Sequence, residues 1–207
     1  MGYYPIFLNI EGRRCVVIGG GPVAERKVEG LLQDGARVTV ISPSLTRCLE
    51  SWANEEKIRH LARDYREGDL ADYQLAFVAT DDDGVNAAVA REGRERGVWV
   101  NAADDPAHCD FILPSVLRRG ELVVAVATGG SSPALSRVIR EELESYFSED
   151  YATLAAIAAE VRRELKDRSV NPKAEDWRQA LGNGLRRLIA AGKQGEAKAY
   201  LLKRLGG

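Results

Sequence analysis

The chain has 207 residues, which is enough for one large domain or for a medium domain followed by a smaller one. Hydrophobic residues make up 45% and charged residues 29%, as is ordinary for a globular protein, and the lack of any apolar run of about 18 residues excludes a membrane-spanning helix. The net charge of −2 favours no nucleic-acid partner. Residues 151–207, however, hold 12 Lys and Arg against 6 Asp and Glu, a net charge of +6. This basic region predicts self-association or an anionic ligand, or it is simply a solvated basic face.

The first half of the chain alternates predicted strands and helices. Residues 14–18, RCVVI, form an apolar run typical of a buried parallel strand. Apolar residues then recur at helical spacing from Pro22 to Asp34, and Gly35 ends this helix. Further strands are predicted at 36–42, 57–64, 73–80 and 98–103, with helices at 45–54 and 86–96. The alternation predicts an α/β fold with a Rossmann-type, doubly wound parallel sheet.

A glycine-rich turn separates the first strand from the first helix. The stretch Gly19-Gly20-Gly21-Pro22-Val23-Ala24 fits G-x-G-x-x-A, in which glycines allow a tight turn and let the backbone approach a pyrophosphate at the start of a helix. The hexapeptide alone is weak evidence for dinucleotide binding, but here it follows a predicted strand and begins a predicted helix, which is the context that such a site requires. We therefore expect a dinucleotide site; the alternative is a glycine turn that merely packs.

The end of the second strand lacks the acid that usually binds the ribose 2′-hydroxyl. Ser42-Pro43-Ser44 stand there instead, and these serines could hold a ribose hydroxyl more weakly. An Arg would suit the 2′-phosphate of NADP, but the only one nearby, Arg47, lies further downstream. The sequence therefore favours NAD over NADP without encoding the choice strongly.

Polar residues also follow the fourth and fifth strands, where ligands of such sheets bind. Thr80 could line the cofactor groove, and the acids at 81–83 suit the N-terminus of the next helix. Asp104 follows the fifth strand with no basic residue near it in the sequence. It could serve as a general base beside a hydride acceptor, or it could simply form a turn.

Histidine and cysteine are sparse, with two His and three Cys in the chain. His108 and Cys109 lie in one loop and lack the usual spacing of metal ligands, so no metal site is predicted; His60 is expected to be structural. Three cysteines without a C-x-x-C pair argue for a reduced, cytoplasmic protein. The N-terminal stretch has no long apolar core, so we expect no signal peptide.

The pattern changes after residue 104. Two apolar runs around residues 118–121 predict a hairpin added to the edge of the sheet, followed by a helix capped by Ser132. A second Gly/Ser-rich turn leads into this helix and could bind an anion. Arginines at the hairpin tip and in the helix could meet the carboxylates of a polyanionic substrate, although a solvated face explains them equally well. The proposed substrate contacts are Arg118, Arg119, Thr128, Ser132 and Arg137. From residue 149 onward only helical spacing occurs, which predicts a small all-helical domain.

Four stretches taken together resemble the precorrin-2 dehydrogenase/sirohydrochlorin ferrochelatase family of sirohaem synthesis. They are YPIFLNIEGRRCVVIGGGPVAERKVEGLL, FVATDDDGVN, VNAADDPAHCDFILPS and LVVAVATGGSSPALSRVIREELE. The likeness covers residues 3–147 in order and is weaker from 148 to 207. It implies a Rossmann domain at 1–112, a dimerisation segment at 113–147 and a helical C-terminal domain at 148–207.

The resemblance also implies an activity. Family members oxidise precorrin-2 to sirohydrochlorin with NAD, many then insert ferrous iron, and they form homodimers. The family's key carboxylate corresponds to Asp104, which could also deliver the metal transiently. The family's cofactor contacts correspond to Gly19 to Val23, to positions near Pro43 and Ser44, and to Thr80. Two alternatives remain open: an NAD-sensing regulatory module that acts through its helical tail, and an unrelated NAD-dependent reductase.

Overall fold

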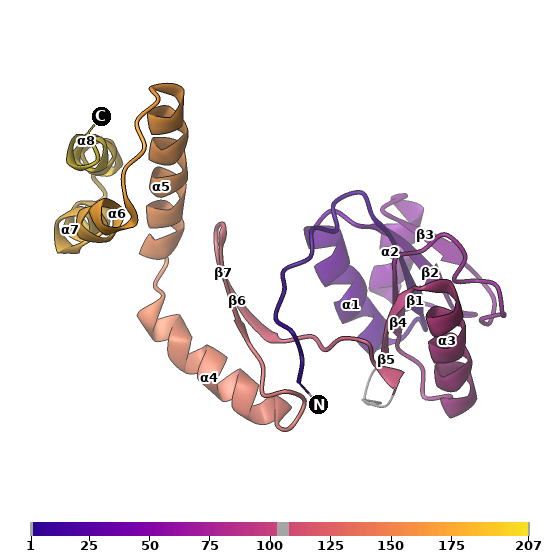
Figure 1. The fold of residues 1–207 in the computed structure, drawn as a ribbon. Coiled ribbons are helices and arrows are strands. Elements are labelled where there is room, and N and C mark those ends of the chain that lie inside the picture. Colours follow the sequence, from indigo (N-terminus) through magenta and orange to yellow (C-terminus); the bar gives the residue numbers. More distant parts are fainter. Residues whose placement is uncertain (1, 103–107, 207) are drawn as a thin grey trace. The chain divides into compact units, whose positions relative to one another are not determined.

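The computed structural model describes residues 2–102 and 108–206, and the chain divides into two compact units, residues 1–112 and 113–207. The elements of the first unit are β1 (Arg14–Ile18), α1 (Pro22–Gln33), β2 (Arg37–Ile41), α2 (Arg47–Asn54), β3 (Ile58–Leu61), β4 (Leu75–Val78), α3 (Asp83–Arg96) and β5 (Trp99–Ala102) (Figure 1). Their strands form one parallel sheet in the order β3-β2-β1-β4-β5. The predicted doubly wound sheet is confirmed.

The central strand β1 shows why this sheet is buried on both faces. Cys15 and Val17 pack into one apolar cluster with residues of α1 and α2, whereas Val16 and Ile18 pack into a second cluster with Val89 of α3. Successive side chains of a strand point to opposite faces, so a continuous apolar run fills both layers at once. The sheet thus carries α1 and α2 on one face and α3 on the other.

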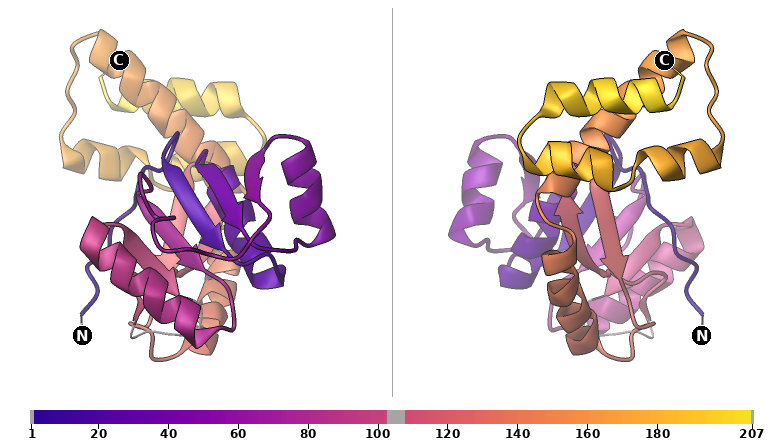
Figure 2. Two further views of the ribbon diagram at one scale, coloured as in Figure 1. Left: turned by 90° about the vertical axis from the view of Figure 1, so that its right-hand side faces the viewer. Right: turned by 90° about the vertical axis from the view of Figure 1, so that its left-hand side faces the viewer.

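The second unit begins with a hairpin, β6 (Ser115–Arg119) and β7 (Leu122–Val126), followed by α4 (Pro133–Tyr146). Figure 2 shows α4 running along this hairpin, and Ser132 caps the helix as predicted, accepting from the N–H of Leu135 at 3.2 Å. Four helices follow: α5 (Asp150–Asp167), α6 (Ala174–Ala180), α7 (Asn183–Ala190) and α8 (Gln194–Arg204). They enclose a separate apolar core that includes Val161, Leu185 and Leu201.

The expected place of the hairpin at the edge of the sheet is wrong, because β6 and β7 form a two-stranded sheet of their own. The outer edge of β5 is occupied instead by the chain that follows it. The Asp110 N–H donates to the Val100 carbonyl oxygen at 2.8 Å, and the Val100 N–H donates to the Asp110 carboxylate at 2.8 Å. These bonds use the groups that a further strand would need.

No helix within residues 2–102 and 108–206 combines the length and apolar character that crossing a membrane requires.

Candidate functional site

The glycine-rich turn joins β1 to α1 at the carboxyl edge of the sheet. Gly19 has a φ of +113°, and a Cβ atom there would lie 2.2 Å from the carbonyl oxygen of Ala79. A Cβ atom on Gly20 would lie 1.9 Å from the carbonyl oxygen of Ser44. Both positions therefore require glycine, because the turn passes too close to the segments after β4 and β2 for a side chain to fit.

Gly21 differs from its neighbours because the space beside it is open. It precedes the first turn of α1 with a φ of −84°, no side chain caps this helix, and nothing lies within 4 Å of a Cβ atom built on it. Pro22, the first helical residue, has no N–H, while Val23 presents one of the N–H groups that lack an acceptor within a helix. The residues of this open helix end therefore fit a pyrophosphate.

The segment after β2 lies across Gly20 and forms the second side of the site. The Thr46 N–H donates to the Gly20 carbonyl oxygen at 3.0 Å. Ser42 is buried, and its hydroxyl donates to the Ser44 carbonyl oxygen at 2.7 Å. The Ser42 hydroxyl hydrogen is thus used to order the loop, whereas Pro43 and Ser44 are exposed and accessible to a ligand.

The end of β4 supplies the third side. Asp82 caps α3, because its Oδ1 accepts from the N–H groups of Gly84 at 2.8 Å and Val85 at 3.1 Å. Thr80 lies just after β4, and its hydroxyl oxygen accepts from the Asp82 N–H at 3.3 Å. The capping role predicted for this acidic stretch is confirmed. The structure brings Thr80 to the same edge of the sheet as the glycine turn, as a cofactor-lining role requires.

Side chains fix the end of β5 and the chain that follows. The Lys27 ammonium of α1 donates to the Asn101 Oδ1 at 2.7 Å, and the Asn101 amide donates to the Phe111 carbonyl oxygen at 2.9 Å. The Cys109 thiol lies 3.1 Å from the Ala102 carbonyl oxygen. The two ends of the intervening segment are thereby held together. Asp104, the predicted base, belongs to that segment and lies outside the described residues.

The remaining histidines and cysteines show no arrangement typical of metal chemistry. His60 Nε2 lies 2.9 Å from the Ser42 carbonyl oxygen, a structural contact. Burial raises the pKa of the Cys15 thiol to about 11, so this thiol stays protonated at neutral pH. Among residues 2–102 and 108–206, no three His, Cys, Asp or Glu side chains come together to hold a metal ion.

The predicted substrate contacts in the second unit fall at opposite ends of the hairpin. Arg119 pairs with Leu122 at the tip, whereas Ser115 pairs with Val126 at the base, about 14 Å away at the usual strand rise. Arg119 donates from Nε to the Phe147 carbonyl oxygen at 2.8 Å, which ties the tip to the end of α4. Arg118 is exposed near it.

The other three predicted contacts lie at the base of the hairpin. The Thr128 hydroxyl donates to the Ser132 carbonyl oxygen and accepts from the Ser132 N–H, both at 3.0 Å. Arg137 is exposed on α4. The structure therefore groups Thr128, Ser132 and Arg137 near one helix start but separates them from Arg118 and Arg119.

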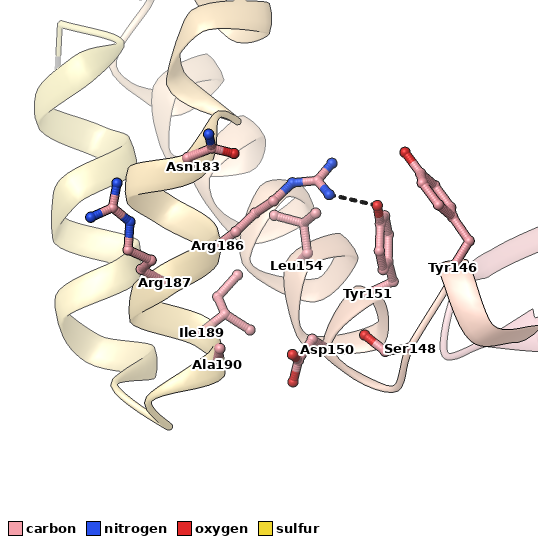
Figure 3. Close-up of a pocket in the computed structure, with 10 residues that line it drawn as sticks. All are labelled: Tyr146, Ser148, Asp150, Tyr151, Leu154, Asn183, Arg186, Arg187, Ile189 and Ala190. Atoms are coloured by element: carbon pink, nitrogen blue, oxygen red, sulfur yellow. Dashed lines mark hydrogen bonds between the residues drawn. The ribbon is translucent and has the colours of Figure 1, made fainter.

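The helical part of the second unit contains an open cavity of about 420 Å³ between α5 and α7 (Figure 3). Arg186 donates to the Tyr151 hydroxyl at 2.6 Å, and its guanidinium carbon lies 5.0 Å from the centre of that ring. Tyr146 and Leu154 also line the cavity. None of the site residues predicted from the sequence lines this cavity. The basic character of residues 151–207 was the sequence feature that pointed to a ligand in this region.

Sequence reasoning missed two charged residues of α1 that face the site. Glu25 accepts a hydrogen bond from the Thr46 hydroxyl, and Lys27 holds Asn101. A charged side chain on an amphipathic helix ordinarily faces solvent, so the helical pattern predicts no site role for either residue. The contacts join residues 21 and 74 positions apart, which no local pattern reveals.

Known proteins resemble both units of the chain. Residues 6–115 match the family model described as "Putative NAD(P)-binding", and residues 119–146 match the model described as "Sirohaem biosynthesis protein central". The siroheme synthase of Nitrosococcus oceani is 41% identical over 203 residues, covering 97% of this chain and 43% of that protein. The siroheme synthase of Methylobacillus flagellatus is 44% identical over 164 residues, covering 79% and 35%. The chain thus spans less than half the length of these curated relatives.

A solved structure matches along its entire length. The structure of "SirC, precorrin-2 dehydrogenase" aligns with a TM-score of 0.79 and 28% identity, covering 97% of this chain and 100% of that one. The resemblance drawn from the sequence motifs is confirmed. Because the matched segment 6–115 is more than half of the chain, the chain belongs to the family described as "Putative NAD(P)-binding", and the central sirohaem-biosynthesis segment that follows makes it similar to siroheme synthases and to a precorrin-2 dehydrogenase.

Proposed function

We propose that this protein oxidises precorrin-2 to sirohydrochlorin in sirohaem biosynthesis, with NAD as the hydride acceptor. The observation that carries the proposal is the likeness to a precorrin-2 dehydrogenase over nearly all of both chains, at a TM-score of 0.79. A shared dinucleotide domain would account only for residues 6–115. The continued likeness through the hairpin and the helices favours this enzyme over an NAD sensor or an unrelated reductase.

We propose that the three segments at the carboxyl edge of the sheet form the cofactor site. Gly21, Pro22 and Val23 would receive the pyrophosphate at the open start of α1, with Gly19 and Gly20 shaping the turn. Pro43 and Ser44 would contact the ribose, ordered by Ser42, and Thr80 would line the groove toward the nicotinamide. When bound, NAD supplies the acceptor for the hydride.

The reaction removes one hydride and one proton from precorrin-2, and the protein must take the proton. We assign this role to Asp104, a carboxylate in the segment after β5. Support comes from the bonds that Asn101 makes with Lys27 and Phe111, because they fix the strand from which that segment departs. Lys27 and Asn101 therefore serve as positioning residues in this proposal.

The substrate carries eight carboxylates, which calls for cationic and N–H donors. We propose that Arg118, Arg119, Thr128, Ser132 and Arg137 contribute these donors. Since Arg118 and Arg119 lie at the other end of the hairpin from the rest, they would meet different carboxylates of the substrate. The exposed position of Arg118 and Arg137 supports such contacts.

We further propose that residues 113–147 form the dimerisation segment, that residues 148–207 form a helical domain, and that the protein works in the cytoplasm. Exposed apolar side chains on the hairpin and α4, such as Val116, Leu135 and Val138, support self-association, because a second copy would remove them from water. The free cysteines Cys15 and Cys48 are in keeping with a reducing compartment.

The test is anaerobic incubation of the full chain with precorrin-2 and NAD. We expect one NADH for each sirohydrochlorin, both followed by absorbance, and no NADH when precorrin-2 is omitted. An NAD sensor would bind the cofactor without forming NADH. A protein that binds NAD but leaves precorrin-2 unchanged would contradict the proposed activity.

A further inference from the structure

Thr46 connects three parts of the cofactor site. Its hydroxyl donates to the Glu25 carboxylate of α1, and the same oxygen accepts from the Leu49 N–H at 3.3 Å, which caps α2. Its own N–H donates to the Gly20 carbonyl oxygen at 3.0 Å. One residue thus ties α1, the glycine turn and α2 together. The loop of residues 42–46, on which the ribose would lie, ends at this junction.

Glu25 brings a negative charge to that loop. It lies in the first turn of α1, and its carboxylate reaches the N-terminus of α2, the neighbouring helix on the same face of the sheet (Figure 1). No acid occurs at Ser42, Pro43 or Ser44, where a ribose-binding carboxylate would ordinarily stand. A carboxylate from the adjacent helix thus reaches the end of this loop.

The opposite charge is also present at this loop. Arg47 is the first residue of α2 and is exposed, immediately after the junction residue Thr46. An arginine here suits a 2′-phosphate, so the loop holds one group that attracts NADP and one that repels it. The preference between NAD and NADP depends on which of these two charges dominates, and the Glu25 carboxylate is the one held in place by a hydrogen bond.

We propose that Glu25 is the specificity-determining residue of the cofactor site. Through Thr46 it holds the ribose loop in place, and its charge disfavours the additional phosphate of NADP. The inference rests on the proposed dinucleotide site and adds the basis of its preference for NAD.

Three variants of the full chain separate charge from positioning. Glu25→Gln keeps the size and an oxygen acceptor but removes the charge. Thr46→Val keeps the charge but removes the hydroxyl. Glu29→Gln is the matched control, because Glu29 is an exposed glutamate one turn further along α1. Dissociation constants for NAD and NADP are measured by calorimetry, with a thermal melt to verify folding.

We expect Glu25→Gln to lower the ratio of the NADP to the NAD dissociation constant about tenfold, the size of one partly screened charge interaction. Thr46→Val should weaken both cofactors with little change in the ratio, and Glu29→Gln should change neither. A folded Glu25→Gln protein with the wild-type ratio would overturn the inference while leaving the NAD site intact. A wild-type chain that binds neither cofactor would overturn the proposed function as well.

Discussion

The glycines of the turn differ in what a substitution would affect, and a substitution of Gly21 should affect NAD binding without affecting folding. Because a Cβ atom there meets nothing within 4 Å, Gly21→Asp should fold normally. Its carboxylate would face the pyrophosphate, and like charges brought together cost several kcal/mol, so NAD binding should weaken more than about 100-fold. The measurement is an NAD titration beside a thermal melt.

Gly20→Ala is the contrasting variant. Its methyl group would lie 1.9 Å from the Ser44 carbonyl oxygen, so this protein should lose thermal stability as well as NAD affinity. If Gly21→Asp bound NAD as tightly as the wild type, the pyrophosphate would have to lie elsewhere.

Asp104 is the residue on which the chemistry of the proposal depends. Asp104→Asn preserves the size of the side chain but removes the proton acceptor, and a positioned base contributes about 10²–10⁴-fold to a rate. Turnover of precorrin-2 should fall by at least about 100-fold while the NAD dissociation constant stays unchanged. Rates of NADH formation check this, with the exposed Asp81→Asn as control. Wild-type turnover in Asp104→Asn would exclude the general-base role.

Among the elements, the long connection between β3 and β4 depends on one carboxylate of α3. Glu92 is buried, with 2% of its side chain exposed, and accepts from the N–H groups of Gly68 at 3.0 Å and Leu70 at 3.1 Å, from the Tyr65 hydroxyl and from the Arg96 Nε at 2.6 Å. Burial alone would raise the pKa of this carboxyl, but the four donors together hold the pKa below its ordinary value.

Glu92→Gln should therefore lower the free energy of unfolding by about 2–3 kcal/mol, since charge-assisted hydrogen bonds are lost in a buried site. A carboxyl with a depressed pKa stabilises the fold above its ordinary pKa, near 4.3, and this contribution disappears as the pH falls through the lower folded value. Urea unfolding at pH 7 and at pH 4 tests both points. The difference between wild type and variant should shrink at the lower pH, and a constant difference would show that the charge is not involved.

The same elements show how far sequence patterns reach. The β1–α1–β2 unit was predictable because a buried apolar run, a glycine turn and helical spacing are local signals. The place of β6 and β7 was not, because the edge of β5 is closed by the side chain and backbone of Asp110, which no strand pattern records. Likewise, the contact of Glu25 with Thr46 depends on two helices meeting over the sheet.

For the whole molecule, the distribution of exposed apolar side chains bears on where a second copy would bind in the proposed dimer. On α4, Leu135 and Val138 are each 49% exposed and Tyr146 is 64% exposed, whereas Ser136 is buried, with its hydroxyl oxygen 3.3 Å from that of Thr128, which follows β7. One side of this helix is therefore buried within the unit, and the other side exposes these apolar side chains among charged ones. An uncovered apolar helix face is typical of a surface that is buried on association.

If the proposed dimer forms through α4, Val138→Asp should convert it into a monomer. The side chain is half exposed, so an aspartate there is solvated in the separate chain and fold stability should change little, but in an interface its charge would be buried without a partner. The dimer dissociation constant should rise by at least about 100-fold, the loss expected for a central interface residue. Sedimentation velocity over a range of concentrations measures it. The control is Glu95→Gln, an exposed change on α3 of the first unit that should leave the dimer intact. If Val138→Asp sedimented as a dimer with wild-type affinity, α4 would lie outside the interface and the segment 113–147 would need another role.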